Sequence, residues 1–471
     1  MERFATAIMI AFRFGGAVLL GTSLSAASVQ FSFELSSISG QGQYIGKDIN
    51  NRGDIVGSLD VIRPDWIWPK RMGFVRRGED VTLIDFPGSE ILNGTEAAGI
   101  NDEGVVVGQF TEAVPGGIIL HGFLLENGQL EQFDVPGSTW TQPADINNLS
   151  VIVGRTHPVS HPVIGEAFVR SGGDYRVFLP GEVQDYFGVF PHGSNNRGDM
   201  VGQVFEGSFA ILDGHYSHFE IPGSYYTSAE GINDAGQIVG WFCKPNCSSI
   251  HGFLMDATGT YQIDAPAEGS YATFLGGVND AGFLVGSVGF HRFPAQELLV
   301  GSPCPVTGEG CRAAQRIADP LIDFTLRVGI DIKPDDGRNT INPSAHGVVP
   351  VAILGSDKFD VINVDVPSLT FGPGGATLMR RQTVDVNDDG FLDLLVHFRT
   401  EDTGITPGSA EACVAGRLDS AQPLEGCDRI QTVGGPGSGE LHGARSLEGW
   451  DRALSVPGLA PGPREQKSEL N

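Results

Sequence analysis

Short apolar runs separated by turn residues dominate the first three hundred residues of the chain. In the clearest example, Ile100-Asn101 ends one run, Asp102-Glu103-Gly104 follows, and the β-branched run Val105–Val107 begins the next. Asn and Gly tolerate the left-handed backbone that a tight hairpin turn needs. The pattern therefore predicts antiparallel strands joined by tight turns.

This hairpin pattern recurs six times. The copies span 48–57, 99–108, 145–154, 194–202, 231–240 and 277–286, and they share Asn50, Asn101, Asn147, Asn195, Asn233 and Asn279. The shared Asn recurs about every 46 residues, which falls within the ~40 to 50 residues of a four-stranded propeller blade.

Two further strands follow each hairpin. A Phe marks the third strand, at Phe74, Phe123, Phe168, Phe209, Phe253 and Phe293. A fourth strand runs into a Pro-Gly turn at 85–89, 134–138 and 220–224, and the turn is degraded at 264–266. One four-stranded blade cannot bury both of its faces, whereas six blades stacked radially can. We therefore predict an all-β chain with a six-bladed β-propeller over residues 28–300.

The tripeptide before each Phe suggests a family. His121-Gly-Phe and His251-Gly-Phe resemble the extracellular HAF-type repeat, and the resemblance covers residues ~40 to 300. It departs from the pattern in the fourth copy, where Ser194-Asn195 replaces Ile-Asn. The resemblance implies export and a propeller-like fold, and it implies no settled activity.

Residues that recur in every repeat are poor candidates for a single converging site. We therefore interpret His121, His251 and His291 as repeated structural contacts, and Asp102, Asp234 and Asp280 as caps of their turns. Insertions that break the repeat, at 63–71, 158–162 and 243–249, are better functional candidates, although plain loop decoration is the alternative.

Composition restricts the partners. The chain has 66 Gly and 28 Pro without a Gly-X-Y period, which suits many short strands. With 30 Lys and Arg against 57 Asp and Glu, its formal charge of −27 argues against nucleic acid and anionic membranes. An acidic surface is compatible with cations, neutral sugars or another protein, and it also keeps an exported protein soluble.

The N-terminus and the cysteines both indicate export. Arg3 and Arg13 precede an apolar run and a small-residue cleavage pattern, so residues 1–27 are predicted to be a secretory signal peptide; a retained membrane anchor is the alternative. No other segment is predicted to span a membrane. The six cysteines form three close pairs, Cys243 with Cys247, Cys304 with Cys311 and Cys413 with Cys427. Local disulfides are expected, and a zinc site is the alternative.

A second, smaller unit follows a predicted linker at 301–323. Residues 324–434 show alternating and continuous apolar runs, which predict a β-sandwich-like domain, and 435–471 read as a disordered tail. The segment 385–393 places oxygen ligands at loop positions one, three, five and nine and Gly390 at position six, as in an EF-hand loop, but position twelve is Val396.

The predicted strands on either side of this loop, 381–384 and 392–398, resemble the strand-loop-strand calcium site of FG-GAP repeats. The resemblance implies a structural calcium ion held by Asp385, Asn387, Asp389 and Asp393, with the Phe391 carbonyl as a further ligand. An acidic turn that shares only the composition of such a loop is the alternative.

These features favour a secreted, monomeric, non-enzymatic binding protein whose propeller presents a loop-built face to a glycan or an extracellular protein. No catalytic residue and no other cofactor is predicted, because Gly-x-Ser-x-Gly, His-Glu-x-x-His and P-loop patterns are absent from the sequence. The alternatives are an extracellular carbohydrate-active hydrolase or lyase with its site at the propeller mouth, and a purely structural protein. Acidic and aromatic side chains gathered at one mouth would argue against the structural reading.

Overall fold

The computed structural model describes residues 29–36, 43–61, 69–89, 94–159, 165–178, 188–205, 207–266, 270–290, 293–304, 311–319, 322–334, 336–356 and 359–433. Within these ranges the chain is all-β, with short 3-10 turns and no α-helix. The predicted signal peptide and C-terminal tail lie outside the described residues. No helix in the described part is both long and apolar enough to cross a membrane.

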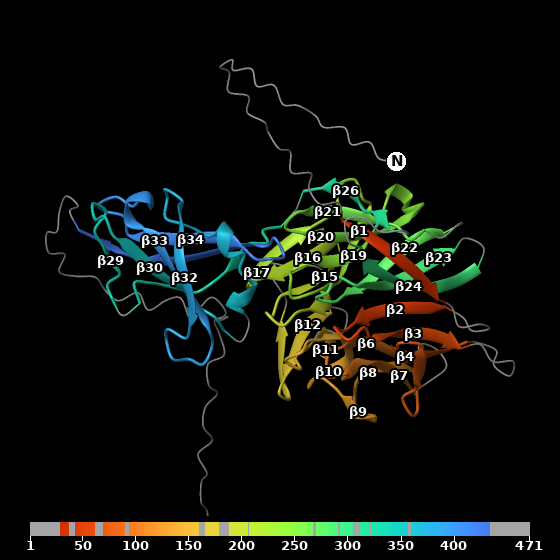
Figure 1. Cartoon of the computed structure of the whole chain (residues 1–471). Coiled ribbons are helices and arrows are strands. Elements are labelled where there is room, and N and C mark those ends of the chain that lie inside the picture. The colour runs from red at the N-terminus through yellow and green to blue at the C-terminus, as the bar shows by residue number, and fades with distance from the viewer. Residues whose placement is uncertain are drawn as a thin grey trace, which may run out of the picture.

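Four repeats form separate four-stranded antiparallel sheets in a propeller-like arrangement (Figure 1). The first two sheets are β2 (Tyr44–Ile49), β3 (Ile55–Val61), β4 (Lys70–Arg77) and β5 (Asp80–Ile84), then β6 (Thr95–Ile100), β7 (Val106–Val114), β8 (Gly117–Glu126) and β9 (Gln129–Phe133). The next two are β10 (Ser138–Ile146), β11 (Ile152–Pro158), β12 (Glu166–Ser171) and β13 (Asp174–Phe178), then β14 (Phe190–Ser194), β15 (Met200–Val204), β16 (Gly207–Leu212) and β17 (His215–Phe219).

The last two repeats lie in one ten-stranded sheet. It contains the run β18 (Tyr226–Ile232), β19 (Ile238–Cys243), β20 (Ile250–Asp256) and β21 (Gly259–Ile263), and the run β22 (Ser270–Val278), β23 (Leu284–Phe290), β24 (Phe293–Pro303) and β1 (Gln30–Ser36). A single parallel bridge, Ile250 with Ala272, joins the two runs. Since β1 pairs antiparallel with β24, the described chain's first strand completes the sheet of the last repeat.

The recurring Phe and Gly of the repeat pack against each other. Phe74, Phe123, Phe168, Phe209 and Phe253 all lie on third strands and are 0% exposed. Each stands opposite the Gly that ends the hairpin motif, and a Cβ at Gly108 would lie 2.7 Å from the Phe123 ring and 2.0 Å from the Glu96 carbonyl oxygen. Glycine is therefore required there by close packing and not by a left-handed backbone.

Part of the stretch that was expected as a linker, 301–323, extends the propeller sheet. β24 continues to Pro303, β25 (Arg312–Ala313) pairs with β1, and β26 (Gln315–Ala318) pairs with β21. Ile322 and Phe324 pack into the core between the fourth and fifth repeats. Apolar side chains at these positions bury surface that a free linker would leave in water.

The second body contains one continuous eight-stranded sheet, where a β-sandwich-like domain was predicted. Its order is β27 (Leu326–Arg327), β35 (Pro423–Arg429), β34 (Glu411–Arg417), β31 (Thr370–Phe371), β32 (Ala376–Val384), β33 (Asp393–Arg399), β30 (Val348–Ile353) and β28 (Ile330–Ile332). β29 (Thr340–Ile341) pairs with β36 (Gln431–Thr432), and η2 (Val361–Asn363), η3 (Val366–Ser368) and η4 (Thr400–Asp402) lie in the connections.

One long strand explains why the sheet is not split in two. β32 pairs with β31 through its first residues and with β33 through the rest, with a bulge between Leu378 and Arg380. Val351 and Val396 on one half share a core cluster with Val414 and Leu424 on the other, so the sheet curls around a single core.

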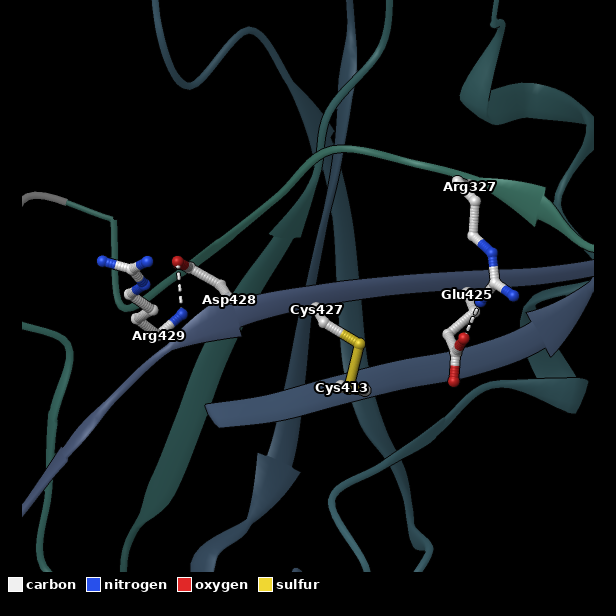
Figure 2. The surroundings of a disulfide bond; sticks show 6 residues. All are labelled: Arg327, Cys413, Glu425, Cys427, Asp428 and Arg429. Atoms are coloured by element: carbon white, nitrogen blue, oxygen red, sulfur yellow. Dashed lines mark hydrogen bonds and ion pairs between the residues drawn. A yellow bond between two sulfur atoms is a disulfide. The ribbon is translucent and has the colours of Figure 1, made fainter. Parts of the chain in front are cut away.

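The predicted local disulfides are confirmed in all three pairs, Cys243–Cys247, Cys304–Cys311 and Cys413–Cys427. Figure 2 shows the third joining facing residues of β34 and β35, with Arg327 of β27 paired to Glu425 on β35. The first closes a short loop that contains η1 (Pro245–Cys247).

The two bodies touch. Arg197 Nη1 donates to Gln422 Oε1 (2.7 Å), Gln422 Nε2 donates to the Phe324 carbonyl (3.0 Å), and Arg327 N donates to Asp213 Oδ2 (3.2 Å). A cleft of about 250 Å³ lies beside these bonds. Burial raises the pKa of Asp213 at this contact.

Candidate functional site

The shared Asn of each repeat serves two turns at once. In all six copies the side-chain Oδ1 accepts the N–H four residues further along the chain. In five copies Nδ2 also donates to the carbonyl of the shared Asn in the next repeat, the last being Asn279 to Asn50 at 3.0 Å. The hydrogen bonds of the last repeat therefore return to the first.

The residue after the shared Asn builds a second cycle, and it corrects one expectation. Asp102, Asp234 and Asp280 do not cap their own turns; each accepts the backbone N–H of the neighbouring repeat's turn. The cycle closes where Asp280 N donates to Asn51 Oδ1 at 2.9 Å. Together with Asn51, Asn148 and Asn196, these residues line a cavity of about 80 Å³ among the six repeats; we call this space the channel and this end of it the turn mouth.

Two carboxyls, the buried Asp145 and the half-buried Asp48, lie in the channel wall where other repeats have glycine. Asp48 Oδ2 accepts the Ile100 N–H, and Asp145 Oδ2 accepts both the N–H and the hydroxyl of Ser194, so each Asp links its own repeat to the next. Burial, followed by the charge of Asp145, raises the pKa of Asp48 to about 8. Burial also raises the pKa of Asp145. The pair therefore retains a proton near neutral pH and acts as a structural contact.

The outer histidines behave as the repeat predicted. His121 Nδ1 lies 2.9 Å from Asp134 Oδ1 and His251 Nδ1 lies 2.8 Å from Asp264 Oδ1, and a Gln side chain joins each pair. The same contact in two repeats indicates a structural role. His291 lies outside the described residues, as do 62–68 and 160–164, which hold most of two insertions that were singled out as functional candidates.

A β-bulge aims one residue per repeat into the channel. The strand register skips the residue three places before each shared Asn, and these residues are Lys47, Ala98, Ala144, His192, Glu230 and Gly276. Bulges re-aim a side chain out of the regular ladder. Three of these residues are small, whereas Lys47, His192 and Glu230 have a charged or imidazole side chain. The side chains in this layer therefore differ between repeats.

Glu230 and His192 form a fixed pair inside the channel. Glu230 Oε1 accepts from Ser228 Oγ (2.6 Å) and from Trp241 Nε1 (2.8 Å). His192 Nδ1 faces two acceptors, the Ala229 carbonyl at 3.0 Å and Glu230 Oε2 at 3.3 Å. Because a carbonyl and an ionised carboxylate can only accept, Nδ1 carries a proton, and Nε2 is the ring nitrogen that remains to face the channel.

Electrostatics keep Glu230 ionised. Burial opposes its charge, but the charges of His192 and Lys47 and the two hydrogen bonds outweigh burial, so the pKa of Glu230 is lowered. An ionised carboxylate beside Nδ1 holds the imidazole in one orientation. The arrangement can therefore present a basic nitrogen to a bound molecule.

A larger cavity of about 190 Å³ opens at the opposite end of the channel, which we call the loop mouth. Its rim carries Glu96, Gln109, Gln142, Arg155 and Phe190. Gln142 Nε2 donates to Gln109 Oε1 (3.0 Å) and Gln109 Nε2 donates to Glu96 Oε2 (2.8 Å), so the polar side chains form one chain of hydrogen bonds.

Arg71, at the end of one predicted insertion, extends this chain of hydrogen bonds beyond the cavity lining. It donates to Glu96 Oε1 (2.7 Å) and to Asp60 Oδ1 (2.9 Å). Although burial acts against its charge, bonds to these two carboxylates raise the pKa of Arg71. The rim is therefore a preorganised surface.

The loop 385–393, predicted to bind calcium, lies between β32 and β33, as expected from the predicted flanking strands. Asp385 Oδ2 accepts the Gly390 N–H (2.9 Å), and Asn387 Nδ2 donates to Asp389 Oδ2 (2.9 Å). Asp393 is 0% exposed, and its two oxygens accept the N–H groups of Gly355 and Val386. Gly390 has φ of 93°, which gives the bend that the pattern requires.

These donors are not drawn together into a compact carboxylate cluster. Among the described residues, the group of His, Cys, Asp and Glu found with ligand atoms within 4.8 Å of one another is Glu411 with Cys413 and Cys427, and both sulfurs are used in a disulfide. The Phe391 side chain is exposed, and its N–H donates to Asp389 Oδ1 (2.9 Å).

Comparisons with known proteins assign this chain to no family. No family model and no curated protein matches it. Among solved structures, an α-L-arabinanase of Penicillium chrysogenum complexed with arabinobiose is 9% identical at a TM-score of 0.32, covering 58% of this chain and 98% of that one. The isopeptidase AtxE2 is 11% identical at 0.27, covering 70% and 58%.

A third similar structure, a bacterial ice-binding adhesin, is 11% identical at a TM-score of 0.16, covering 82% of this chain and 94% of that one. All three scores lie below 0.5, so the propeller-like fold rests on this chain's own strand pairing.

The residues that face the channel were not predicted from the sequence. Lys47, His192 and Glu230 belong to no known motif, and a repeat search discards positions that vary. A usable signal was present: when the repeats are aligned on the shared Asn, one column holds small residues in three copies and charged or imidazole side chains in the other three. The bulge that turns this column inward has no mark of its own in the sequence.

Proposed function

We propose that the six repeats close into a six-bladed ring and that its loop mouth binds an oligosaccharide, so that the protein acts as an exported binding module. The main support for this proposal is that side chains which differ between the repeats line one cavity of about 190 Å³. The closed cycle of turn hydrogen bonds that ends at Asp280 and Asn51, together with the bond from Asn279 back to Asn50, supports the ring.

The chemistry of the rim favours a sugar. Gln109 and Gln142 offer amide groups that can both donate and accept, Glu96 accepts, and Phe190 offers an apolar face. Such a mixture of convergent polar groups and aromatic surface is typical of small-ligand sites. Three disulfides support export to an oxidising compartment.

Replacing Gln109 by Ala is expected to weaken glycan binding about 5- to 100-fold, because a buried hydrogen-bonding partner is worth ~1–3 kcal/mol. Gln203→Ala is the matched control, since Gln203 follows the motif Gly of the fourth repeat as Gln109 follows that of the second, but it does not line the cavity. A glycan array followed by calorimetry on the hits measures both. Equal losses in the two variants, or no glycan bound by the native chain, would overturn the proposal.

A second candidate is a carbohydrate-active hydrolase or lyase, and the Glu230–His192 pair favours it. An imidazole whose Nδ1 is held by a carboxylate is an arrangement suited to general acid–base catalysis. Chromatography of the bound glycans after incubation separates the two functions, because a binding module returns them unchanged. Product formation that is lost in His192→Asn would establish the enzyme.

We also propose that the loop 385–393 binds calcium and thereby stabilises the second body. Asp385, Asn387, Asp389, Asp393 and the Phe391 carbonyl supply the oxygen donors that calcium prefers. Carboxylate oxygens that already accept one N–H each, as in Asp385 and Asp393, keep further lone pairs for an ion.

Calcium is expected to raise the temperature of unfolding of the second body, because a ligand at about 100 times its Kd stabilises the folded state by about 2.7 kcal/mol. The double variant Asp385→Asn/Asp389→Asn should lose this shift. Asp388→Asn removes one charge from the same loop without removing an assigned ligand, so it should keep the shift. Calorimetry with calcium and with chelator decides, and identical traces for the native chain in both buffers would refute the site.

A further inference from the structure

The loop mouth has two chemically different sides. In each repeat, the residue five places before the shared Asn pairs across the strands with the residue after the motif Gly, and these pairs make one layer around the loop mouth. The pairs that line the cavity on the second and third repeats are polar, namely Glu96 with Gln109 and Gln142 with Arg155. In the fifth and sixth repeats the same layer carries two aromatic side chains, Trp241 and Phe274. The layer is therefore polar on one side and aromatic on the other.

Tyr226 joins Trp241 and Phe274 in a continuous aromatic surface, which we call the aromatic floor. The ring centres of Tyr226 and Trp241 lie 5.3 Å apart, and those of Trp241 and Phe274 lie 5.4 Å apart. Both distances fall within the ~4.5–7 Å of interacting aromatic pairs. All three side chains are half-buried, so part of each remains open to solvent. The open part offers an apolar surface on which a flat molecule can stack.

The aromatic floor touches the wall of the cavity. Trp241 Nε1 donates to Glu230 Oε1 (2.8 Å), and Glu230 lines the cavity of about 190 Å³. Glu230 also acts on Tyr226, because burial, followed by the charge of Glu230, raises the pKa of Tyr226. The phenol therefore stays protonated at neutral pH and can donate to a hydroxyl group. The floor lies one side chain beyond the cavity.

The disulfide-closed insertion 243–249 holds the floor in place. Tyr226 pairs with Cys243 in the strand register, and the N–H of Tyr225 donates to the Cys243 carbonyl (2.8 Å). The bond from Cys243 to Cys247 closes the loop that begins there. The backbone around Tyr226 is therefore fixed before a ligand arrives, which lowers the cost of binding.

We infer that the aromatic floor is a second sugar subsite, so that the loop mouth takes an oligosaccharide of at least two hexopyranose residues and not a single sugar. This rests on the proposed glycan function and narrows it. Gln109 and Gln142 hold one residue inside the cavity, which neither Trp241 nor Tyr226 lines. The next residue of the sugar chain lies past Glu230 and stacks a face of C–H groups on the floor.

The test titrates the full mature chain by calorimetry with four size series, the cello-, malto-, manno- and galacto-oligosaccharides, each with its monosaccharide. In a series that the chain binds, sugars of two or more residues are expected to bind about 2- to 10-fold more tightly than the monosaccharide, because a stacked ring contributes free energy of that order. Tyr226→Ala should abolish this gain and leave the monosaccharide affinity unchanged. Tyr226→Phe retains the ring and should keep most of the gain.

Tyr216→Ala is the matched control. Tyr216 is also half-buried and stacks on an aromatic ring, with 6.1 Å between the ring centres of Tyr216 and Phe209. It lies on β17, the strand at the edge of the fourth sheet, and it does not line the cavity. Tyr216→Ala should therefore leave the gain with sugar length unchanged.

A failure of the second subsite differs from a failure of the glycan function. If longer sugars bind no more tightly than monosaccharides, or if Tyr226→Ala and Tyr216→Ala behave alike, the second subsite is overturned while a Gln109-dependent glycan site still stands. If none of the four series is bound, the hexopyranose assignment is overturned, whatever other glycan the array selects. Absence of any glycan binding removes the proposed function itself and the subsite with it.

Discussion

Replacing Phe253 by Ala is expected to lower the free energy of unfolding of the propeller by about 3–5 kcal/mol, the range for a buried Phe truncated to Ala. The ring is 0% exposed on β20 and belongs to a core cluster that also holds residues of the fourth repeat and Phe324. Because the motif Gly240 leaves no side chain that could shift into the vacated space, the surrounding chain can relax only in part.

Phe283→Ala is the matched control for this prediction. Phe283 follows the turn of the sixth repeat and is 36% exposed, so its truncation removes much less buried surface and should cost under ~1.5 kcal/mol. Urea unfolding followed by tryptophan fluorescence measures both variants. Similar losses for the two would show that the recurring Phe is not the centre of each sheet's packing.

The features that the sequence could predict are those that repeat. Gly, Asn and Phe recur because each has one local physical task, namely close packing, turn capping and core filling. Six copies make each task visible without a structure. The disulfides were predictable for a related reason, since Cys413 and Cys427 are near in sequence and need no knowledge of the fold.

What escaped prediction depends on contacts between distant segments. Asp102 looked like a cap of its own turn, and only the ring places the Asn51 N–H against it. Ile322 was assigned to the linker and Phe324 to the second domain, because the core that they fill belongs to repeats about a hundred residues earlier. The bond from Arg197 to Gln422 spans 225 residues, and no local pattern could indicate it.

The candidate site escaped for a different reason. In a repeat fold, functional residues lie at positions where the repeats differ in sequence. A single sequence does not show whether such a difference is functional or neutral. Lys47 and Glu230 become meaningful only when the bulge places them in one channel layer. The pattern of the proposed calcium loop can be recognised in the sequence because its spacing is local, whereas nothing in that spacing indicates that Asp393 also accepts the N–H of Gly355 from another connection.

Replacing Asn279 by Ala should test ring closure, with an expected cost of about 2–3 kcal/mol. The change removes the acceptor for the Phe283 N–H and the Nδ2 donor to the Asn50 carbonyl, which then keeps only the Gly53 N–H. Asn147→Ala breaks the equivalent bond inside the array, to Asn195, and is the reference for an intact junction between repeats.

Asn101→Ala is the variant that isolates the bond between repeats. Asn101 caps its own turn like the others, but its Nδ2 is buried with no hydrogen-bond partner among the described residues, so the variant loses the cap alone. In a closed ring Asn279→Ala should exceed Asn101→Ala by about 1 kcal/mol and should match Asn147→Ala. In an open array Asn279 would have no Asn50 to reach, and its replacement would cost no more than that of Asn101. Chemical denaturation of the three variants therefore decides whether the last repeat closes on the first, which determines whether Lys47 and Glu230 can share one channel.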